Sequence, residues 1–415
     1  MVSYVKKIVK EAKKSSFLLS QVNAQLKDEI LLLMAEELIR NKDVIFKANE
    51  KDIELAKAKK VKKSFLDRLV LNEKRIKEMA SSLKEIAYLS DPLNRVIEGW
   101  QVPQGLRIKK VSVPLGVILI IYEARPNVTS DCVGLCFKTS NVVILRGGSL
   151  AINSNKAIYK CLLKVAYERL NFPPFFLVEK TDYTIVDLLL KENEYIDLVI
   201  PRGGEDLIRK VTQASSIPVI KHYKGVCHIF VDEFANLEEA LKICINAKVQ
   251  RPAVCNAVET ILVHRKVASC FLPPLKKEFD KYKVVIKGDA ATQKVLKGIK
   301  KATTRDWSRE YLDLVVSIKV VENIDEAIEH INFYGSHHTD SIITENVENA
   351  NKFVSRVDSA CCFVNISTRL SDGYQFGLGA EMGISTDKLH ARGPMGLKEL
   401  TTYKYIVEGR YNLRE

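Results

Sequence analysis

The sequence predicts an α/β protein with two doubly wound domains and a small β arm. Three observations lead to this fold class. Apolar residues recur at helical spacing through the first ninety residues. From about Val111 the chain alternates short, almost continuous apolar runs with helix-length amphipathic segments. Two further segments read as exposed strands. Because strands without a polar face must be covered on both sides, the alternating part predicts parallel sheets between layers of helices.

The first ninety residues are expected to form helices. One apolar stripe runs from Leu31 to Ile39 and a second from Leu66 to Ile86, both at helical spacing. We interpret the two stripes as faces that pack into a core.

Two series of strands follow, separated by helix-length stretches. The first series is expected at 116–122, 141–147, 175–179, 196–203 and 217–222. The second series is expected at 227–232, 260–267, 282–288, 314–321, 341–346 and 361–366. Each series predicts one α/β domain, and such sheets hold nucleotides at the carboxyl ends of their strands.

Residues 100–114 and 401–413 fit neither series. The first segment resembles two strands joined by a Pro-Gln-Gly turn, and the second alternates like an exposed strand. Unpaired strand edges of this kind are usually covered by a partner chain. We therefore expect a homo-oligomer, a dimer or larger.

Composition and charge narrow the classes of function. The 415 residues carry a net charge of +13, which would suit an anionic partner. Basic and acidic residues are interleaved, as in KDIELAKAKKVKKSFLDR, which is more typical of solvated helix faces than of a nucleic-acid groove. No apolar run approaches the roughly 18 residues of a membrane span, and the first residues lack the apolar core of a secretory signal. We expect a cytoplasmic protein that binds neither nucleic acid nor membrane.

The cysteine and histidine spacings argue against metal sites and disulfides. The nine cysteines include no CxxC pair and no zinc-site spacing, which fits a reducing compartment. His337 and His338 are adjacent, and Cys227 and His228 are neighbours on an expected strand, where they point to opposite faces. We expect no metal.

Three strands of the first series end in loops suited to an anionic ligand. No GxGxxG motif is present, but Arg146 is followed by two glycines, IPRGG ends near Gly204, and Pro126 and Asn127 open a helix. A single glycine after a strand is most often only a turn. Three such loops together favour a nucleotide-like ligand.

Cys255 is the best candidate for a nucleophile. It lies in a loop between a helix and a strand, whereas the other cysteines mostly lie inside apolar runs. Pro252 fixes the approach of this loop, and Arg251 supplies positive charge that lowers a thiol pKa. An inert small side chain is the alternative that composition alone leaves open.

Six segments carry a resemblance to a known family. They are VPLGVILIIYEARPN at 113–127, LRGG at 145–148, IDLVIPRGG at 196–204, RPAVCNAVETILVH at 251–264, EYLD at 310–313 and FGLGAEMGISTDKLHARGPMGL at 376–397. Through them nearly the whole chain resembles the gamma-glutamyl phosphate reductases of the aldehyde dehydrogenase superfamily. The resemblance implies the fold of that superfamily and NADPH-dependent reduction of L-glutamyl 5-phosphate to L-glutamate 5-semialdehyde, with release of phosphate, in proline biosynthesis. It also implies that a glutamate 5-kinase supplies the substrate.

The same resemblance implies roles for single residues. Cys255 matches the nucleophile, and Asn127 matches an amide that stabilises the oxyanion. Arg146 matches a basic residue near the adenosine ribose and Gly147 a further cofactor-binding position, although Ser149 and Leu150 stand where many relatives have Lys and Glu. The remaining matches are Gly203 and Gly204 for the dinucleotide phosphates, Glu310 for the nicotinamide ribose, and Arg125, Arg369 and Arg392 as candidates for the anionic groups of the substrate.

The resemblance also divides the chain. Residues 1–97 and 115–228 are expected to form the cofactor-binding domain, 229–397 the catalytic domain, and 98–114 with 398–415 the oligomerisation arm. Two alternatives remain at this point: an acylating aldehyde dehydrogenase that uses coenzyme A thioesters or another acyl phosphate, and a noncatalytic scaffold of the same fold.

One absence in the sequence bears on the mechanism. No carboxylate occurs between Asp206 and Asp232, where hydrolytic aldehyde dehydrogenases carry the glutamate that activates water. His222 lies in this stretch and is a possible replacement. We expect a thioester on Cys255 to be protected from hydrolysis.

Overall fold

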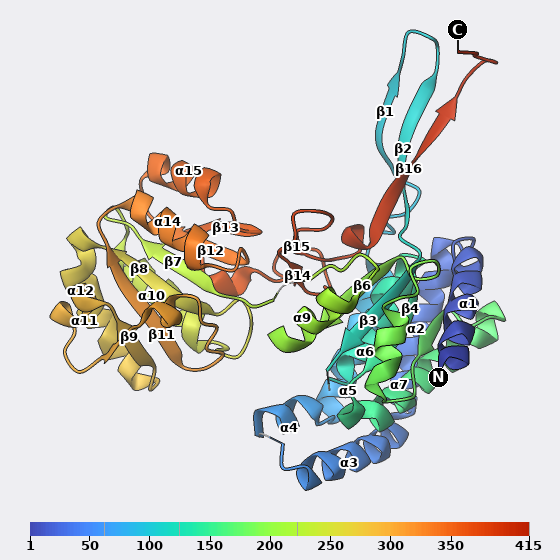
Figure 1. Cartoon of the computed structure of the whole chain (residues 1–415), viewed down its shortest axis with the longest axis horizontal. Helices are drawn as coiled ribbons and strands as arrows, with labels where there is room; N and C mark the ends of the chain where they lie inside the picture. Colours follow the sequence, from blue (N-terminus) through green and yellow to red (C-terminus); the bar gives the residue numbers. More distant parts are fainter. Residues whose placement is uncertain (62, 124, 222, 415) are drawn as a thin grey trace. The chain divides into compact units, whose positions relative to one another are not determined.

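The chain folds into two compact units, as a computed structural model of residues 1–61, 63–123, 125–221 and 223–414 shows (Figure 1). Unit 1 comprises the described residues up to Lys221, together with Gly377–Gly383 and Met395 onward. Unit 2 comprises the rest, up to Phe376 and from Ile384 to Pro394. No helix among the described residues combines the length and the apolar character of a membrane span.

The helices expected in the first ninety residues are present. They are α1 (Val2–Leu19), α2 (Ala24–Arg40), α3 (Lys42–Ala58), α4 (Lys63–Leu69) and α5 (Glu73–Tyr88). Asn23 and Asn72 cap α2 and α5 by accepting hydrogen bonds from the backbone N–H three residues ahead. The apolar stripes read from the sequence are core faces, since Leu31 and Ile86 are fully buried.

Unit 1 contains a four-stranded parallel sheet with the strand order β5-β4-β3-β6. Its strands are β3 (Val117–Tyr122), β4 (Val142–Gly147), β5 (Phe175–Leu177) and β6 (Leu198–Arg202), and its helices are α6 (Asn127–Lys138), α7 (Ile152–Leu170), α8 (Tyr183–Leu189) and α9 (Glu205–Ala214), with the 3-10 turn η1 (Ser149–Ala151) before α7. All residues of β3 and β4 are buried, as their unbroken apolar runs predicted.

The helices cover both faces of this sheet. Helices α6 and α7 pack against each other, whereas α1 packs on β3, β4 and β5 and against α8. The strand order explains why helices lie on both faces. The chain passes from β3 through β4 to β5 at one edge of the sheet and then returns to place β6 on the other side of β3. Because crossovers between parallel strands are right-handed, the helices before and after this reversal cover opposite faces.

The prediction of a strand at 217–222 is wrong. Within the described part of that range, only Val219 forms an isolated bridge, to Val199. Pro218 has no N–H to donate, so the segment makes two hydrogen bonds to Val199 and does not continue as a strand.

Strands β1 (Val96–Gln101), β2 (Arg107–Pro114) and β16 (Thr401–Glu408) form an antiparallel three-stranded arm in the order β1-β2-β16. The expected hairpin is present, with a turn closed by Gly105 donating to Val102. The terminal strand pairs with β2 of its own chain, so the unpaired backbone expected along 100–114 is limited to the outer edges of β1 and β16.

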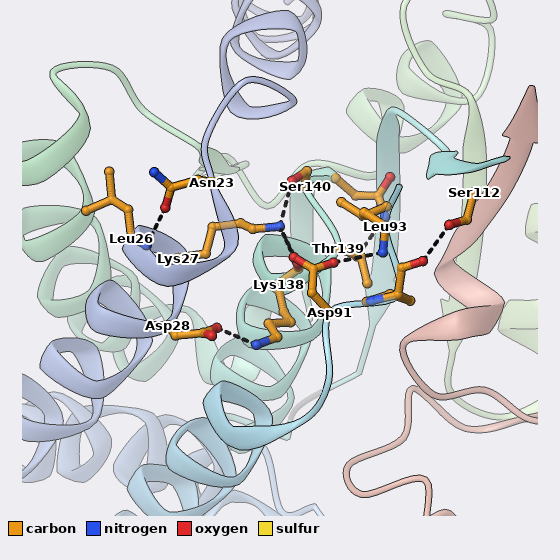
Figure 2. Close-up of polar contacts among 12 residues, drawn as sticks. Asn23, Leu26, Lys27, Asp28, Asp91, Leu93, Ser112, Lys138, Thr139 and Ser140 are labelled. Atoms are coloured by element: carbon orange, nitrogen blue, oxygen red, sulfur yellow. Dashed lines mark hydrogen bonds and ion pairs between the residues drawn. The ribbon is translucent and has the colours of Figure 1, made fainter. Parts of the chain in front are cut away.

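Two buried lysines fix the root of this arm (Figure 2). The Lys27 ammonium, on α2, donates to Asp91 at 2.9 Å, to the Lys138 carbonyl at 2.8 Å and to Ser140 at 3.0 Å. Lys138 in turn contacts Asp28 and donates to the Ala87 carbonyl. Burial lowers the pKa of Lys27, which the Asp91 carboxylate opposes. Asp91 stands five residues before β1, so this network joins α2, the end of α6 and the chain that enters the arm.

Unit 2 contains a seven-stranded parallel sheet in the order β10-β9-β11-β8-β7-β12-β13. The strands are β7 (Cys227–Val231), β8 (Val258–His264), β9 (Val285–Gly288), β10 (Lys300–Lys301), β11 (Val315–Val321), β12 (Thr339–Ile343) and β13 (Cys361–Val364). The helices are α10 (Leu237–Val249), α11 (Arg265–Lys281), α12 (Ala290–Val295), α13 (Thr304–Trp307), α14 (Ile324–Tyr334) and α15 (Val347–Arg356). Smaller elements are η2 (Thr368–Leu370), β14 (Ile384–Ser385), β15 (Gly393–Pro394) and, in unit 1, η3 (Lys398–Leu400). Two buried apolar clusters hold this sheet between its helices.

Candidate active site

The three candidate loops of unit 1 meet at one edge of its sheet. Tyr122 of β3 is in register with Gly147 of β4 and with Arg202 of β6, so all three strands end at the same level. Gly203 and Gly204 follow β6 and open α9, where the Gly204 N–H donates to the Glu123 carboxylate at 3.2 Å. The parallel register therefore brings the Arg-Gly segments together at the carboxyl ends of the strands.

Arg146 is held in place by backbone groups. Its guanidinium donates to the carbonyl of Gly147 at 2.7 Å and to that of Thr181 at 2.8 Å. The side chain is buried, its Nε has no hydrogen-bond partner, and no described carboxylate forms an ion pair with it. Burial lowers the pKa of this guanidinium. A buried cation with a donor to spare is suited to an anionic ligand.

A cavity of about 280 Å³ lies at the same edge, between the strand ends and helices α8 and α9. Arg146 and Lys210 line it, and both lie near the ring of Tyr183, at 5.5 Å and 5.4 Å from its centroid. The apolar part of the lining comes from Ile121, Val186, Leu190, Leu207 and Val211, and acidic groups come from Glu123, Asp187 and Asp206. The lining thus combines apolar side chains that fit a flat ring and two cations that suit a phosphate with three carboxylates.

Asn127 is the first residue of α6 and is exposed. Its side-chain nitrogen donates to the Asp131 carboxylate at 3.2 Å, one turn further along the helix. An amide nitrogen carries two N–H groups, so this bond fixes the orientation of the amide and leaves one donor.

In unit 2 the loop of Cys255 is packed against two neighbouring segments. The carbonyl of Cys255 accepts a hydrogen bond from the Cys227 thiol at 3.2 Å. A Cβ on Gly225 would lie 1.8 Å from the same carbonyl oxygen, so only glycine permits this approach. The backbone of the loop is thus fixed, while the Cys255 side chain is partly exposed.

Cys255 differs from the buried cysteines in exposure and in its surroundings. Burial raises the pKa of the thiols of six others and keeps them protonated: Cys132, Cys136, Cys161, Cys227, Cys244 and Cys362. Arg369 is half-buried, and its pKa is lowered first by burial and then by Arg251, while Cys255 opposes that shift. Two guanidinium groups, those of Arg251 and Arg369, therefore interact electrostatically at the Cys255 loop.

Arg369 also shapes the Cys255 loop directly. Its guanidinium bonds to the side chain of Gln250 at 2.9 Å and to that of Asn256, the residue after Cys255. Asn256 donates in turn to the Ser371 carbonyl at 2.8 Å. Arg369 was a candidate for the substrate's anionic groups on sequence alone, and the geometry gives it at least one role as a support of the loop.

Glu310 lies on the same side of unit 2. Its carboxylate accepts the backbone N–H of Gly225 at 2.8 Å, and Lys224 donates to the Ser308 carbonyl at 2.7 Å. Because Gly225 also contacts the Cys255 carbonyl, a single residue joins the Glu310 segment to the Cys255 loop.

The remaining candidates are less concentrated. Arg392 bonds to Asp358 through both the carbonyl, at 3.2 Å, and the carboxylate, at 2.8 Å. Arg125 is exposed, two residues before Asn127. His222 lies outside the described residues.

Sequence reasoning missed three features of the site. In unit 2, Gly225, Cys255 and Glu310 precede β7, β8 and β11, so they lie at the amino ends of these strands. Open α/β sheets usually bind ligands at the carboxyl ends of their strands, and the sequence analysis considered only those ends. Lys210 and Tyr183 were not singled out, because a lysine and a tyrosine on amphipathic helices carry no local signal. The buried Lys248–Glu259 pair, with 2.7 Å between the charged atoms, was also missed, although a Lys and a Glu flanking the Cys255 loop could have indicated it.

Comparison with known proteins places this geometry in a family. The model of the "Aldehyde dehydrogenase family" matches residues 2–295. The gamma-glutamyl phosphate reductase of Caldanaerobacter subterraneus is 53% identical over 408 residues, covering 98% of both chains, and that of Nautilia profundicola is 51% identical over 413 residues, covering 99% of this chain and 100% of the other. The chain belongs to the gamma-glutamyl phosphate reductases of the aldehyde dehydrogenase family. It is an oxidoreductase of that family.

Solved structures agree with this assignment. The crystal structure of the gamma-glutamyl phosphate reductase of Thermotoga maritima has a TM-score of 0.96 and 46% identity, covering 99% of this chain and 100% of the other. An acetylating aldehyde dehydrogenase of Geobacillus thermoglucosidasius has a TM-score of 0.69 at 15% identity, covering 100% of this chain and 98% of the other. The second likeness concerns the fold alone, and it confirms the aldehyde dehydrogenase-like architecture predicted from the sequence.

Proposed function

We propose that this member of the family reduces L-glutamyl 5-phosphate to L-glutamate 5-semialdehyde with NADPH, releasing phosphate through a thioester on Cys255. One observation carries the proposal: Cys255 is a partly exposed thiol on a fixed loop beside Arg369, whereas most of the other thiols are buried. The names of the relatives supply the substrate. A kinase that phosphorylates the glutamate side chain, a glutamate 5-kinase, must precede this enzyme in proline biosynthesis.

We assign cofactor binding to unit 1 and covalent chemistry to unit 2. The cavity beside Arg146 fits the adenosine end of NADPH, since its lining combines apolar side chains with two cations for a 2′-phosphate. The Gly203–Gly204 turn at the start of α9 suits the dinucleotide phosphates. Glu310 is assigned to the nicotinamide ribose. When bound, NADPH supplies the hydride that reduces the thioester.

The chain's own residues carry the acyl transfer. The Cys255 thiolate attacks the acyl carbonyl, and the oxyanion is stabilised by the free N–H of the Asn127 amide and the backbone N–H of Cys255. The tetrahedral intermediate expels phosphate and leaves the thioester. After reduction, the thiohemiacetal collapses to free aldehyde and the Cys255 thiolate.

The substrate carries a carboxylate and a phosphate, which require cations. Arg125 and Arg392 remain the candidates from the matched motifs. Arg392 is already paired with Asp358, so binding a substrate anion would exchange or share that partner. Arg369 acts by holding the Cys255 loop.

Replacement of the thiol tests the proposal. We expect Cys255→Ala to abolish NADPH-dependent reduction, a loss of more than about 10³-fold, while cofactor affinity and the melting temperature stay near those of the wild type. Cys255→Ser should fail too, because an alkoxide is scarce near neutral pH without a dedicated base. Cys270→Ala is the matched control, since Cys270 is exposed on α11.

The substrate class needs a separate measurement. Glutamate semialdehyde with phosphate and NADP should be turned over far better than acetyl-coenzyme A or acetyl phosphate with NADPH. Substantial activity of Cys255→Ala, or a preference for coenzyme A thioesters, would contradict the proposed function.

A further inference from the structure

Lys248 and Glu259 form an ion pair in the interior of unit 2. Both side chains are 0% exposed, and the Lys248 ammonium lies 2.7 Å from a Glu259 oxygen. Lys248 is in the last turn of α10 and Glu259 is the second residue of β8. The pair therefore joins the two ends of the loop that carries Cys255.

Lys248 and Glu259 each make a second contact, and both of these contacts go to the segment that contains Leu312 and Asp313. The remaining Glu259 oxygen accepts the backbone N–H of Leu312 at 3.3 Å, and the Lys248 ammonium donates to the Asp313 carbonyl at 3.3 Å. Leu312 has φ +54°, a left-handed conformation that is unfavourable for a leucine. Such a residue keeps this conformation only where its surroundings impose it.

The segment held in this way carries Glu310. Its other end is fixed by the bond from Lys224 to the Ser308 carbonyl, at 2.7 Å. Between these ends, the Glu310 carboxylate accepts the Gly225 N–H at 2.8 Å, and Gly225 lies against the Cys255 carbonyl. The Cys255 loop and the Glu310 segment are thus connected through Gly225 and through the buried pair.

Stability alone does not account for burying two charges. Desolvation offsets most of the attraction between such partners, and apolar residues of similar volume often serve as well or better. Apolar residues cannot, however, accept the Leu312 N–H or donate to the Asp313 carbonyl. The specific contribution of the pair is the position of this segment.

We propose that Lys248 and Glu259 are positioning residues that place Glu310 relative to the Cys255 loop. The inference rests on the proposed function in one respect, the assignment of Glu310 to the cofactor. Its consequence is that removing the pair weakens cofactor binding through Glu310 and not through the fold.

A cycle of variants tests this coupling. Lys248→Met/Glu259→Leu removes both charges at similar volume. We expect it to bind NADPH about 10-fold more weakly in a fluorescence titration, with a raised KM for NADPH and little change in kcat, while its circular dichroism and melting temperature stay close to the wild type. In a Glu310→Gln background the same two substitutions should weaken binding less than twofold, because the group through which they act is already altered.

The controls separate a local from a general effect. Lys242→Met, on the exposed side of α10, removes a lysine paired with Glu238 and Glu239 at the surface and should leave the dissociation constant unchanged. Lys248→Met/Glu259→Gln retains an acceptor for the Leu312 N–H without a buried charge, so it should restore part of the affinity. If the Leu variant does not fold, the Gln variant takes its place in the cycle, with a smaller loss that again disappears in the Glu310→Gln background.

Each alternative result is decisive. Equal losses with and without Glu310→Gln, or no loss in the first variant, would overturn the positioning role. A wild-type chain that binds neither NADPH nor NADP would contradict the proposed function as well, which distinguishes the two failures.

Discussion

The orientation of Arg146 is set before any ligand arrives, because two backbone carbonyls hold its guanidinium. Lys210, by contrast, is exposed and touches Tyr183. We predict that Lys210→Met and Arg146→Met each weaken NADPH binding about 10-fold or more, since a charge-assisted hydrogen bond contributes about 1.5–3 kcal/mol. Binding of NADH should change less than twofold.

Dissociation constants for both cofactors check this prediction. Lys156→Met is the control, because Lys156 pairs with Glu179 at the surface of unit 1. Equal losses for NADPH and NADH would show that the residue supports the cavity and does not recognise the 2′-phosphate.

His330 predicts a dependence of stability on pH. It is 5% exposed, both ring nitrogens lack hydrogen-bond partners, and it packs against Trp307 and Tyr334 with ring centroids 5.5 Å and 4.7 Å away. Burial, followed by the neighbouring His228 and Lys319, lowers its pKa to about 2. Below about pH 6.5 the unfolded chain therefore binds a proton that the folded chain does not, so the free energy of unfolding falls as the pH falls.

Between pH 7 and pH 5 this single group should cost about 2 kcal/mol of stability. We predict that His330→Phe, which fits the aromatic cluster, loses less stability over that range than the wild type. Urea unfolding at both pH values measures the difference, with Phe333→Leu on the exposed side of α14 as the control. Parallel losses in wild type and His330→Phe would show that His330 is protonated in the folded state.

At the scale of elements, the sequence predicted what depends on local pattern. Continuous apolar runs identified β3, β4, β7, β8 and β11, and 3.6-residue stripes identified the helices before them. The segment at 217–222 failed because its apolar run is interrupted by Pro218, which weakens the ladder. The pairing of β16 with β2 was missed because the two strands are almost 300 residues apart and nothing in either specifies the other.

Local sequence likewise predicted some parts of the candidate site and not others. Arg146 lies at the end of one recognisable strand and the Gly203–Gly204 turn directly follows another, so their convergence followed from parallel register. The contacts of Cys255 with Gly225, and of Glu310 with the same glycine, join segments far apart in the chain, and no local pattern encodes them.

The exposed strands of the arm predict that the chain forms an oligomer. All of β1 and all but the first residue of β16 are exposed, and they present apolar side chains such as Ile97, Trp100 and Val407. Exposed apolar strands with open edges are covered in a soluble assembly. We predict a dimer or larger oligomer at micromolar concentration, and dissociation by Ile97→Lys/Val407→Lys.

Light scattering coupled to size-exclusion chromatography measures the mass. Val44→Lys, on an exposed position of α3, should leave it unchanged. A wild-type chain that runs with the mass of a monomer would contradict the prediction.

At the scale of the whole molecule, the decisive property is the fate of the proposed thioester on Cys255. Between Asp206 and Asp232 the chain has no carboxylate that could activate water, and the next acidic groups near Cys255 are engaged: Glu259 pairs with Lys248, and Glu310 accepts the Gly225 N–H. We therefore predict that water is not activated at this thioester. The thioester would then be consumed by phosphate in the oxidative direction and by hydride in the reductive direction.

This partition predicts that oxidation of glutamate semialdehyde requires phosphate. With enzyme, semialdehyde and NADP alone, the thioester should form once per Cys255 and then persist, so NADPH appears as a burst of about one equivalent at most. Phosphate should convert the burst into steady turnover by releasing glutamyl phosphate. Arsenate should do the same, because it is a nucleophile of the same geometry. Absorbance of NADPH with and without each anion makes the measurement, and the Cys255→Ala variant gives the background. Steady turnover without phosphate, with glutamate as the product, would show that the chain activates water at the thioester, and the reduction of an acyl phosphate would then no longer follow from this site.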